Sequence, residues 1–127
     1  MQNDWAEDLP ENCPPSAAYP PDNQVYYRLV SKFPPTEVDF FSQRKLFPNR
    51  SFKTNECRAM SVSVFSSFRK CSDILKFPVH KGKKIVQVTL TADSGVVRQT
   101  GRTEEHYSWW RRRNYLPKCK EIDSSDE

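Results

Sequence analysis

One segment near the C-terminal end of the chain combines residue types that both catalysis and binding use. Residues 100–114 read TGRTEEHYSWWRRRN and hold one of the two histidines beside two adjacent glutamates. An imidazole is a natural general base near neutral pH, which makes His106 a candidate catalytic residue. Glu104 and Glu105 could orient the ring or act as acids themselves. The alternative is a surface loop with ordinary charges.

Arg28, Ser61 and Ser63, which come from earlier segments of the chain, could complete such a site. The segment 24–30, QVYYRLV, is typical of a strand, and it places Arg28 among apolar neighbours on one face. Ser61 and Ser63 alternate with valines in a second strand and share a face. These serines could line a pocket with Arg28, whose guanidinium group is suited to binding an anion. The simpler alternative is that all three side chains face water.

A basic and aromatic cluster between residues 81 and 113 indicates a different chemistry. Basic residues interleaved with aromatic rings suit phosphate contacts combined with base stacking. Strand alternation would direct either Trp109 or Trp110 to the core and leave the other exposed or covering a groove. The residues predicted to contact a nucleic acid or another polyanion are Lys81, Lys83, Lys84, Arg98, Arg102, Trp110, Arg111, Arg112 and Arg113.

The charge distribution favours an anionic partner. The net charge of the chain is +4 at pH 7. Residues 1–23 contain five acids and no Lys or Arg, and residues 117–127 carry −2, so residues 24–116 carry +11. A strongly basic body attracts polyanions. The acidic, proline-rich first segment could dock a basic protein partner, fold back on the body, or simply aid solubility.

Length and composition indicate one folded domain between two flanking segments. A chain of 127 residues has room for a single core, and 13% aromatic residues distinguish it from disordered proteins. We expect a Pro-rich acidic arm at 1–23, a basic α+β domain at 24–116 and a disordered acidic tail at 117–127. No run of about 18 apolar residues is present, and the first residues do not resemble a signal peptide. A cytoplasmic protein without membrane contact is therefore expected.

The cysteine pattern predicts neither a metal site nor disulfides. The four cysteines are scattered, with no C-x-x-C pair and no closely spaced histidine partners. In the cytoplasm thiols stay reduced, so we expect four free cysteines.

The elements that must position these residues are strands and helices that alternate in the first part of the domain, followed by two strands that form a hairpin. Thr36 is the expected N-cap of a helix that ends before Pro48. A turn at Asp93-Ser94-Gly95 is expected to join two strands directly. The result is an α+β fold with a small, mainly antiparallel sheet of four to five strands and two helices. Strands are expected at 24–30, 57–65, 85–90 and 96–100, with a short one at Trp109-Trp110, and the second helix at 66–76.

Several motifs together resemble an uncharacterised family of small bacterial proteins. The pattern is Y-R, then P-P-T-x-x-D-F-x-S, S-V, T-G and H-x-[ST]-x-W, which covers residues 26–110. The resemblance implies the order of elements, while the family has no established activity. Ala59 stands where the family has a glycine, and Tyr107 where it has a second histidine. A site that needs both histidines would be impaired in this chain.

The layout is also distantly similar to ADP-ribosyltransferase-like proteins, which bind NAD. That similarity implies that Arg28 binds the pyrophosphate and that Ser61 or Ser63 supports the nicotinamide side. Glu104 or Glu105 would stabilise the oxocarbenium-like ribose. This chain lacks the usual E-x-E spacing, because its two glutamates are adjacent and would point to opposite sides of a strand.

Two functions of different classes follow. The first is a small basic bacterial protein that binds nucleic acid or another polyanion, alone or within a complex, and needs no cofactor. The alternative is an ADP-ribosyltransferase-like enzyme, a toxin or defence effector acting on NAD or a nucleotide. Its catalytic set would be Arg28, Ser61, Ser63, Glu104, Glu105 and His106.

Overall fold

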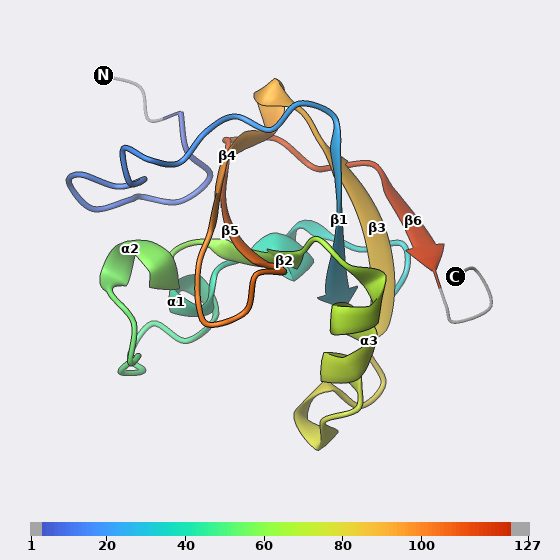
Figure 1. Cartoon of the computed structure of the whole chain (residues 1–127). Helices are drawn as coiled ribbons and strands as arrows, with labels where there is room; N and C mark the ends of the chain where they lie inside the picture. Colours follow the sequence, from blue (N-terminus) through green and yellow to red (C-terminus); the bar gives the residue numbers. More distant parts are fainter. Residues whose placement is uncertain (1–3, 123–127) are drawn as a thin grey trace.

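Segments in which β-branched and aromatic residues alternate with polar ones form a single six-stranded antiparallel sheet. The computed structural model describes residues 4–122. The spatial order of the strands is β4-β5-β2-β1-β3-β6, and the sheet twists so that β4 and β6 lie on opposite sides of the molecule (Figure 1). The strands are β1 (Gln24–Val30), β2 (Val62–Phe65), β3 (Lys84–Leu90), β4 (Gly95–Gln99), β5 (His106–Arg111) and β6 (Cys119–Ile122).

Short helices connect the strands and begin at side-chain caps. The hydroxyl of Ser67 accepts a hydrogen bond from the Lys70 amide and starts α3, within the range 66–76 expected for the second helix. Tyr27 of β1 packs edge-on against Phe68 of α3, so this helix covers one end of a sheet face. The helices are α1 (Gln43–Leu46), α2 (Glu56–Ala59) and α3 (Phe68–Leu75), with 3₁₀ turns at Glu37–Phe40, Pro78–His80 and Ala92–Ser94.

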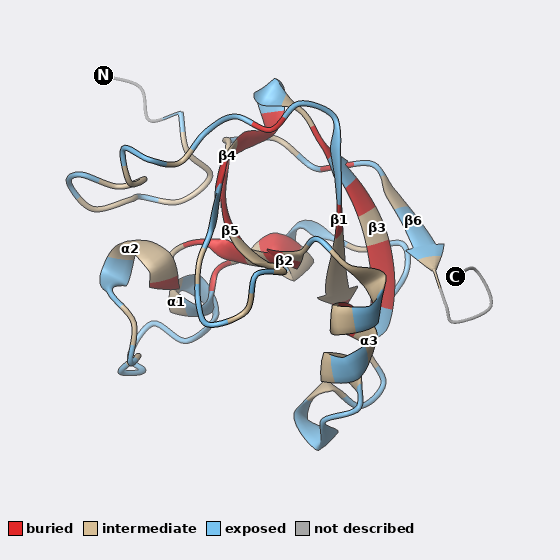
Figure 2. Cartoon of the chain, in the orientation of Figure 1, coloured by how far each residue is buried: buried red, intermediate tan, exposed pale blue. Residues whose placement is uncertain are grey.

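The core lies on the other face of the sheet. Figure 2 shows that buried residues concentrate along β3, β4 and β5. Trp109 is fully buried there, and its indole N–H donates to the Ser94 carbonyl at 2.9 Å. Burial of these large apolar side chains is the main term that stabilises the fold. The core cluster comprises Tyr26, Val30, Phe40, Val62, Val64, Val86, Val88, Leu90, Val97 and Trp109.

The α+β class is confirmed, but three details of the prediction are wrong. Six strands and three α-helices replace the expected four to five strands and two helices. The chain extends through Phe41 and Ser42, which divides the helix expected after Thr36 into a 3₁₀ turn and α1. The segment from Cys57 begins as α2, because the Asn55 side chain caps a helical turn, and β2 starts only at Val62.

The expected hairpin through Asp93-Ser94-Gly95 is also absent from the described residues. β3 pairs with β1 and β6, whereas β4 pairs with β5. The carbonyl of Trp110 and the amide of Arg112 approach Gly95 so closely that an added Cβ would lie 2.0 Å from the carbonyl oxygen. Gly95 therefore allows close contact with β5 rather than a tight return to β3.

The C-terminal segment is not wholly a disordered tail. Cys119–Ile122 forms β6, which pairs with the exposed edge of β3 through Val88 and Ile85. Cys119 lies opposite Val88 and packs against the core cluster, whereas Ile122, three residues later, is on the other face of the strand. Residues 123–127 of the predicted tail lie outside the described residues.

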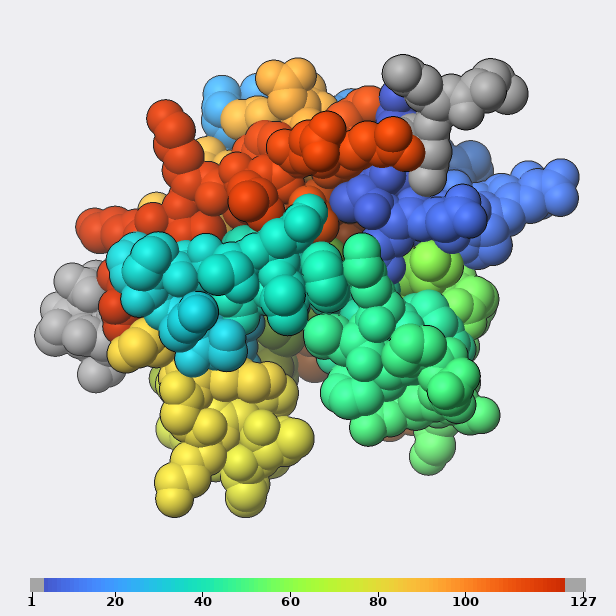
Figure 3. All heavy atoms as spheres, turned by 180° about the vertical axis from the view of Figure 1, so that it is seen from behind, coloured from blue at the N-terminus to red at the C-terminus, as the bar shows by residue number. Residues whose placement is uncertain are grey.

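The arm packs on the body through β-bridges and hydrogen bonds. Tyr19 forms a β-bridge with Val97 at the edge of β4, and Trp5 forms one with Arg112. The Glu7 carboxylate accepts a hydrogen bond from the Ser42 amide at 2.8 Å. Figure 3 shows the arm against the segment that follows β5. The acidic arm therefore folds back on the body, one of the arrangements considered from the sequence.

A disulfide joins Cys13 of the arm to Cys57 of α2, across 44 residues. The expectation of four free thiols is wrong for this pair, because tertiary packing brings together cysteines whose spacing matches no local motif. Cys71 and Cys119 are free. Disulfides are typical of oxidising environments, so a cytoplasmic location stays a prediction. In the described part of the chain, no helix is long and apolar enough to cross a membrane.

Candidate functional site

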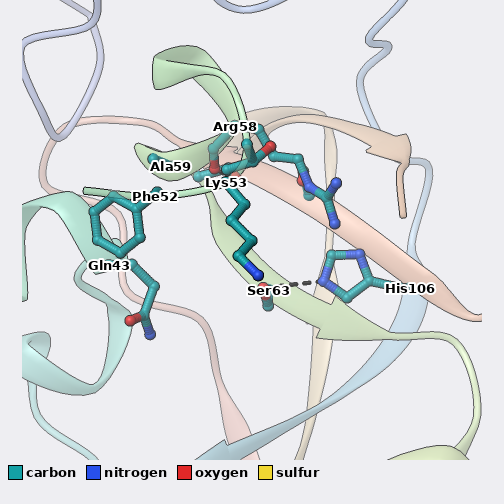
Figure 4. A pocket seen from close by; sticks show the side chains of 10 residues that line it. Gln43, Phe52, Lys53, Arg58, Ala59, Ser63 and His106 are labelled. Carbon is teal, nitrogen blue, oxygen red and sulfur yellow. Dashed lines mark hydrogen bonds between the residues drawn. The ribbon is translucent and has the colours of Figure 1, made fainter. Parts of the chain in front are cut away.

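A pocket opens on the sheet face opposite the core, between β2, β5 and the segment that leads into α2. Its volume is about 350 Å³, which is within the range of small-molecule sites. Figure 4 shows side chains from three separate parts of the chain pointing into it. The lining residues are Gln43, Phe52, Lys53, Thr54, Arg58, Ala59, Ser61, Ser63, His106 and Ser108.

Strand register brings Ser63 and His106 together at the floor of this pocket. Ser63 pairs with Ser108 and Phe65 with His106, so all four side chains share one sheet face. The Ser63 hydroxyl lies 3.0 Å from Nε2 of His106 (Figure 4). The two candidates predicted from sequence thus form a direct hydrogen bond.

The tautomer of His106 follows from its second partner. Its Nδ1 lies 3.1 Å from the backbone carbonyl oxygen of Thr100. A carbonyl can only accept, so Nδ1 carries the proton and donates it. In the neutral ring Nε2 then holds a lone pair, and the Ser63 hydroxyl donates to it. The Thr100 hydroxyl, also 3.1 Å from Nδ1, is 2.8 Å from the hydroxyl of Ser108.

The surroundings of His106 favour its neutral form. Burial lowers the pKa of His106 below its usual value, the hydrogen bond to Thr100 opposes this, and the positive charge of Arg58 lowers the pKa further. The Phe65 ring meets the imidazole edge-on at 5.3 Å and holds its plane. At neutral pH the ring is therefore an uncharged base in a fixed orientation.

Two cations line the pocket above this pair. The Lys53 side chain extends down toward Ser63, and the Arg58 guanidinium lies on the His106 side (Figure 4). A Cβ added at Gly101 would lie 2.8 Å from Nη2 of Arg58 and 3.6 Å from Nδ1 of His106. Gly101 has a positive φ of +79°, and its lack of a side chain leaves room for the guanidinium. Among the described residues, neither cation forms a salt bridge.

The pocket lining is unusual in charge. It contains Lys53, Arg58, His106 and four hydroxyl residues, but no carboxylate. Ser61 is buried and its hydroxyl donates to the Arg58 carbonyl at 2.7 Å, so it supports the turn that carries the arginine. Such a lining is complementary to an anion.

Arg28 does not belong to this pocket. Its Nη1 donates to the main-chain carbonyl of Ser63 at 2.6 Å and its Nε to the carbonyl of Asp39 at 2.9 Å. β1 and β2 share a single register pair, Tyr27 with Phe65, and the guanidinium occupies the position where their pairing ends. Burial lowers the pKa of Arg28 to about 10, while the charge of Asp39 raises it. Arg28 remains charged at pH 7 and has a structural role.

The two glutamates are also outside the pocket. Glu104 and Glu105 lie in the turn between β4 and β5, and neither lines the cavity. The backbone carbonyl of Glu105 accepts a hydrogen bond from the Ser66 amide at 2.9 Å. The predicted catalytic set is therefore divided: Ser61, Ser63 and His106 meet, whereas Arg28, Glu104 and Glu105 do not join them.

The predicted nucleic-acid contacts are wrong for two residues. Trp110 is 1% exposed, and its indole donates to the Cys57 carbonyl. Arg111 is 4% exposed, and it bonds to the Tyr115 carbonyl and the Glu37 carboxylate. The two side chains point to opposite faces of β5, where α2 covers Trp110 and the segments of Glu37 and Tyr115 enclose Arg111.

The other predicted basic residues reach solvent but are spread over the molecule. Lys81, Lys83 and Lys84 follow α3 in a lobe that projects from the body (Figure 3). Arg98 and Arg102 belong to β4 and the turn after it, and Arg112 and Arg113 lie beside the arm. These residues are close in sequence, but on the surface they form separate basic regions and not one continuous patch.

Sequence reasoning missed the two pocket cations. Lys53 and Arg58 flank Asn55, the residue that caps α2, in a segment that has no periodic pattern. The one available signal was the local excess of polar residues before a helix cap.

Comparisons with protein families, with curated proteins and with solved structures gave no match to this chain. In residues 4–122, no group of three or more His, Cys, Asp or Glu side chains could hold a metal ion.

Proposed function

We propose that this pocket binds a phosphate group of a nucleic acid or of another phosphate-bearing polyanion. The observation that carries the proposal is the convergence of Lys53 and Arg58 above the Ser63–His106 pair, with no carboxylate in the lining. Arginine and lysine supply charge-assisted hydrogen bonds, and hydroxyl groups supply neutral ones. This is the donor set that a tetrahedral oxyanion requires.

The rim of the pocket favours a nucleotide over a bare anion. Phe52 lines one side, and the Arg44 guanidinium lies 4.8 Å from its ring centroid. An aromatic ring stiffened by such a contact is suited to stacking against a base. Gln43, exposed beside it, offers an amide that both donates and accepts hydrogen bonds at a base edge.

The charge of the whole body supports the same ligand. Residues 24–116 carry +11, whereas the acidic arm is held against the β4 side of the molecule by its bridges. Long-range attraction would concentrate a polyanion near the pocket and make its binding dependent on salt. The other exposed lysines and arginines would then increase the rate at which the polyanion meets the protein, without contacting it in the pocket.

The pocket lends less support to NAD binding in the manner of ADP-ribosyltransferases. That prediction requires Arg28 and a glutamate in one cleft with the serines, but the guanidinium of Arg28 is occupied by two backbone carbonyls. One observation still favours an enzymatic function. Ser63 and His106 form the hydrogen bond that a catalytic pair would need.

Fluorescence anisotropy with short labelled single-stranded RNA and DNA tests the proposal. We expect the Lys53→Ala/Arg58→Ala double variant to bind at least about tenfold more weakly and to show a shallower dependence of log affinity on log salt, by about one to two in slope. A charge-matched control is Lys81→Ala/Lys83→Ala, whose residues lie in the projecting lobe. Equal losses in both double variants, or salt-independent binding, would refute a specific phosphate site.

A further inference from the structure

We infer that Ser63 is a nucleophile that His106 activates for attack on a phosphodiester bound in the pocket. The inference rests on the proposed phosphate site and adds a reaction to it. Three observations support it: the bond between the serine hydroxyl and the base, the group that orients the base, and the cations above them. Together these are the parts that nucleophilic catalysis by serine needs.

The serine and histidine have the geometry of an activated pair. The 3.0 Å bond between Oγ and Nε2 is within the range for proton transfer to a general base. Because the Thr100 carbonyl fixes the proton on Nδ1, the ring can accept only through Nε2, which faces Ser63. The carbonyl takes the orienting role that a carboxylate has in a catalytic triad.

Ser63 is the only one of the three pocket serines that is suited to attack. Ser108 is fully buried and its hydroxyl bonds to that of Thr100. Ser61 is buried and donates to the Arg58 carbonyl. Ser63 is half-buried, and its hydroxyl meets both the base and the open volume of the pocket.

The backbone of Ser63 is held on two sides. β2 pairs with β5 through residues 62–65, and on the side of β1 the Ser63 carbonyl accepts the 2.6 Å bond from Arg28. Arg28 is thus a positioning residue that acts through the main chain of the nucleophile. A nucleophile on a rigid strand keeps its alignment with the base, which lowers the cost of reaching the reactive geometry.

The cations match the charge that develops during the reaction. Attack on a phosphodiester adds negative charge to the oxygens around phosphorus, and Lys53 and Arg58 line the space above Ser63 where these oxygens would lie. Fixed positive groups at that position stabilise the transition state more than the ground state. A pocket with two cations and no carboxylate therefore favours a phosphate ester over an uncharged ester.

The reaction is balanced with water as the only co-reactant. The Ser63 oxygen forms a bond to phosphorus as its proton passes to Nε2 of His106. The bond from phosphorus to one ester oxygen breaks, and the departing alkoxide takes the proton from Nε2. Water then attacks the phosphoserine diester, its proton passes to Nε2, and the phosphorus–Oγ bond breaks while Oγ regains a proton. The products are an alcohol and a phosphate monoester.

The test uses two probes with the full chain. A fluorophosphonate labels an activated serine through a neutral phosphorus centre, and intact mass with peptide mapping locates the adduct. Bis(4-nitrophenyl) phosphate reports turnover of an anionic phosphodiester by release of nitrophenolate. We expect labelling at Ser63 and release of nitrophenolate, both abolished in Ser63→Ala and both at least about 100-fold slower in His106→Ala, the usual size of general-base catalysis. The matched controls are Ser66→Ala and His80→Ala, at an exposed serine and at the other histidine.

The outcomes separate this inference from the proposed phosphate site. If the wild-type protein binds nucleic acid through Lys53 and Arg58 but its serine is not labelled, the inference is wrong and the binding site stands. If Ser63 is labelled but the Lys53→Ala/Arg58→Ala variant binds nucleic acid normally, the serine is activated but the phosphate site is wrong, and the inferred reaction on a phosphodiester is overturned with it. Labelling that proceeds equally fast in His106→Ala also overturns the inference. Circular dichroism of each variant excludes loss of fold as the cause.

Discussion

Nε2 of His106 and the hydroxyl of Ser63 lie 3.0 Å apart, although the two residues are 43 positions apart in sequence. Pairing of β2 with β5 alone brings them together, and the Thr100 carbonyl decides which nitrogen of the ring faces the serine. A serine, a neutral base and two cations thus share one carboxylate-free pocket.

The pH dependence of Ser63 labelling should reflect the lowered pKa of His106. The base acts in its neutral form, so the rate should fall only as the pH drops below the ordinary histidine range. Removing the positive charge of Arg58 should raise the pKa, so in Arg58→Gln the inflection of the rate profile should move to higher pH. Labelling rates between about pH 4 and pH 8 measure this, and Arg98→Gln, an exposed site, is the control. An unchanged or acid-shifted inflection in Arg58→Gln would contradict the assignment.

Arg28 should matter for stability more than any exposed arginine. Arg28→Met removes the donors to the carbonyls of Ser63 and Asp39 and leaves these oxygens without partners at the gap between β1 and β2. We expect the free energy of unfolding to fall by about 2–4 kcal/mol, the usual effect of breaking a buried charged network. Urea denaturation measures it, with Arg98→Met expected to change stability by less than about 0.5 kcal/mol. Equal stability of the two variants would mean that Arg28 is not structural.

The Cys13–Cys57 disulfide should stabilise the folded chain by tethering the arm. It closes a loop across 44 residues, for which the loop-entropy relation gives about 4 kcal/mol. Cys13→Ser/Cys57→Ser should therefore unfold at lower urea concentration than the wild type. A reducing agent should lower the wild-type midpoint to that of the variant and leave the variant unchanged. A wild-type midpoint that does not respond to reduction would show that the bond contributes nothing.

Two glycines offer a matched pair for testing the position of Arg58. Gly101 and Gly82 both have positive φ, +79° and +87°, so alanine strains the backbone at either site. Only at Gly101 would the new Cβ meet the Arg58 guanidinium, at 2.8 Å, whereas at Gly82 nothing lies within 4 Å. We expect similar losses of stability, of about 1 kcal/mol, but weaker nucleic-acid binding in Gly101→Ala alone. Equal affinities of Gly101→Ala and Gly82→Ala would place Arg58 outside the binding contact.

Local patterns predicted the elements that depend mainly on their own residues. Alternation of apolar and polar residues identified β1 and β3 within one residue of their ends, and the helix expected at 66–76 contains α3. Strand alternation made Ser63 a candidate site residue, and the chemistry of its imidazole made His106 another, in both cases without knowledge of the partner strand.

Tertiary structure alone decided which of those residues meet. Arg28 shares the chemistry of an anion-binding residue, but its guanidinium is held by the carbonyls of Ser63 and Asp39. Lys53 and Arg58 have no pattern of their own, and they enter the pocket because α2 folds against β5, where Trp110 bonds to the Cys57 carbonyl. Composition and periodicity determined the α+β class, the basic body and the strand faces. Strand order, the disulfide and the membership of the pocket depend on contacts between distant segments, whose pairing is set by burial of the whole core and is not encoded in any one stretch.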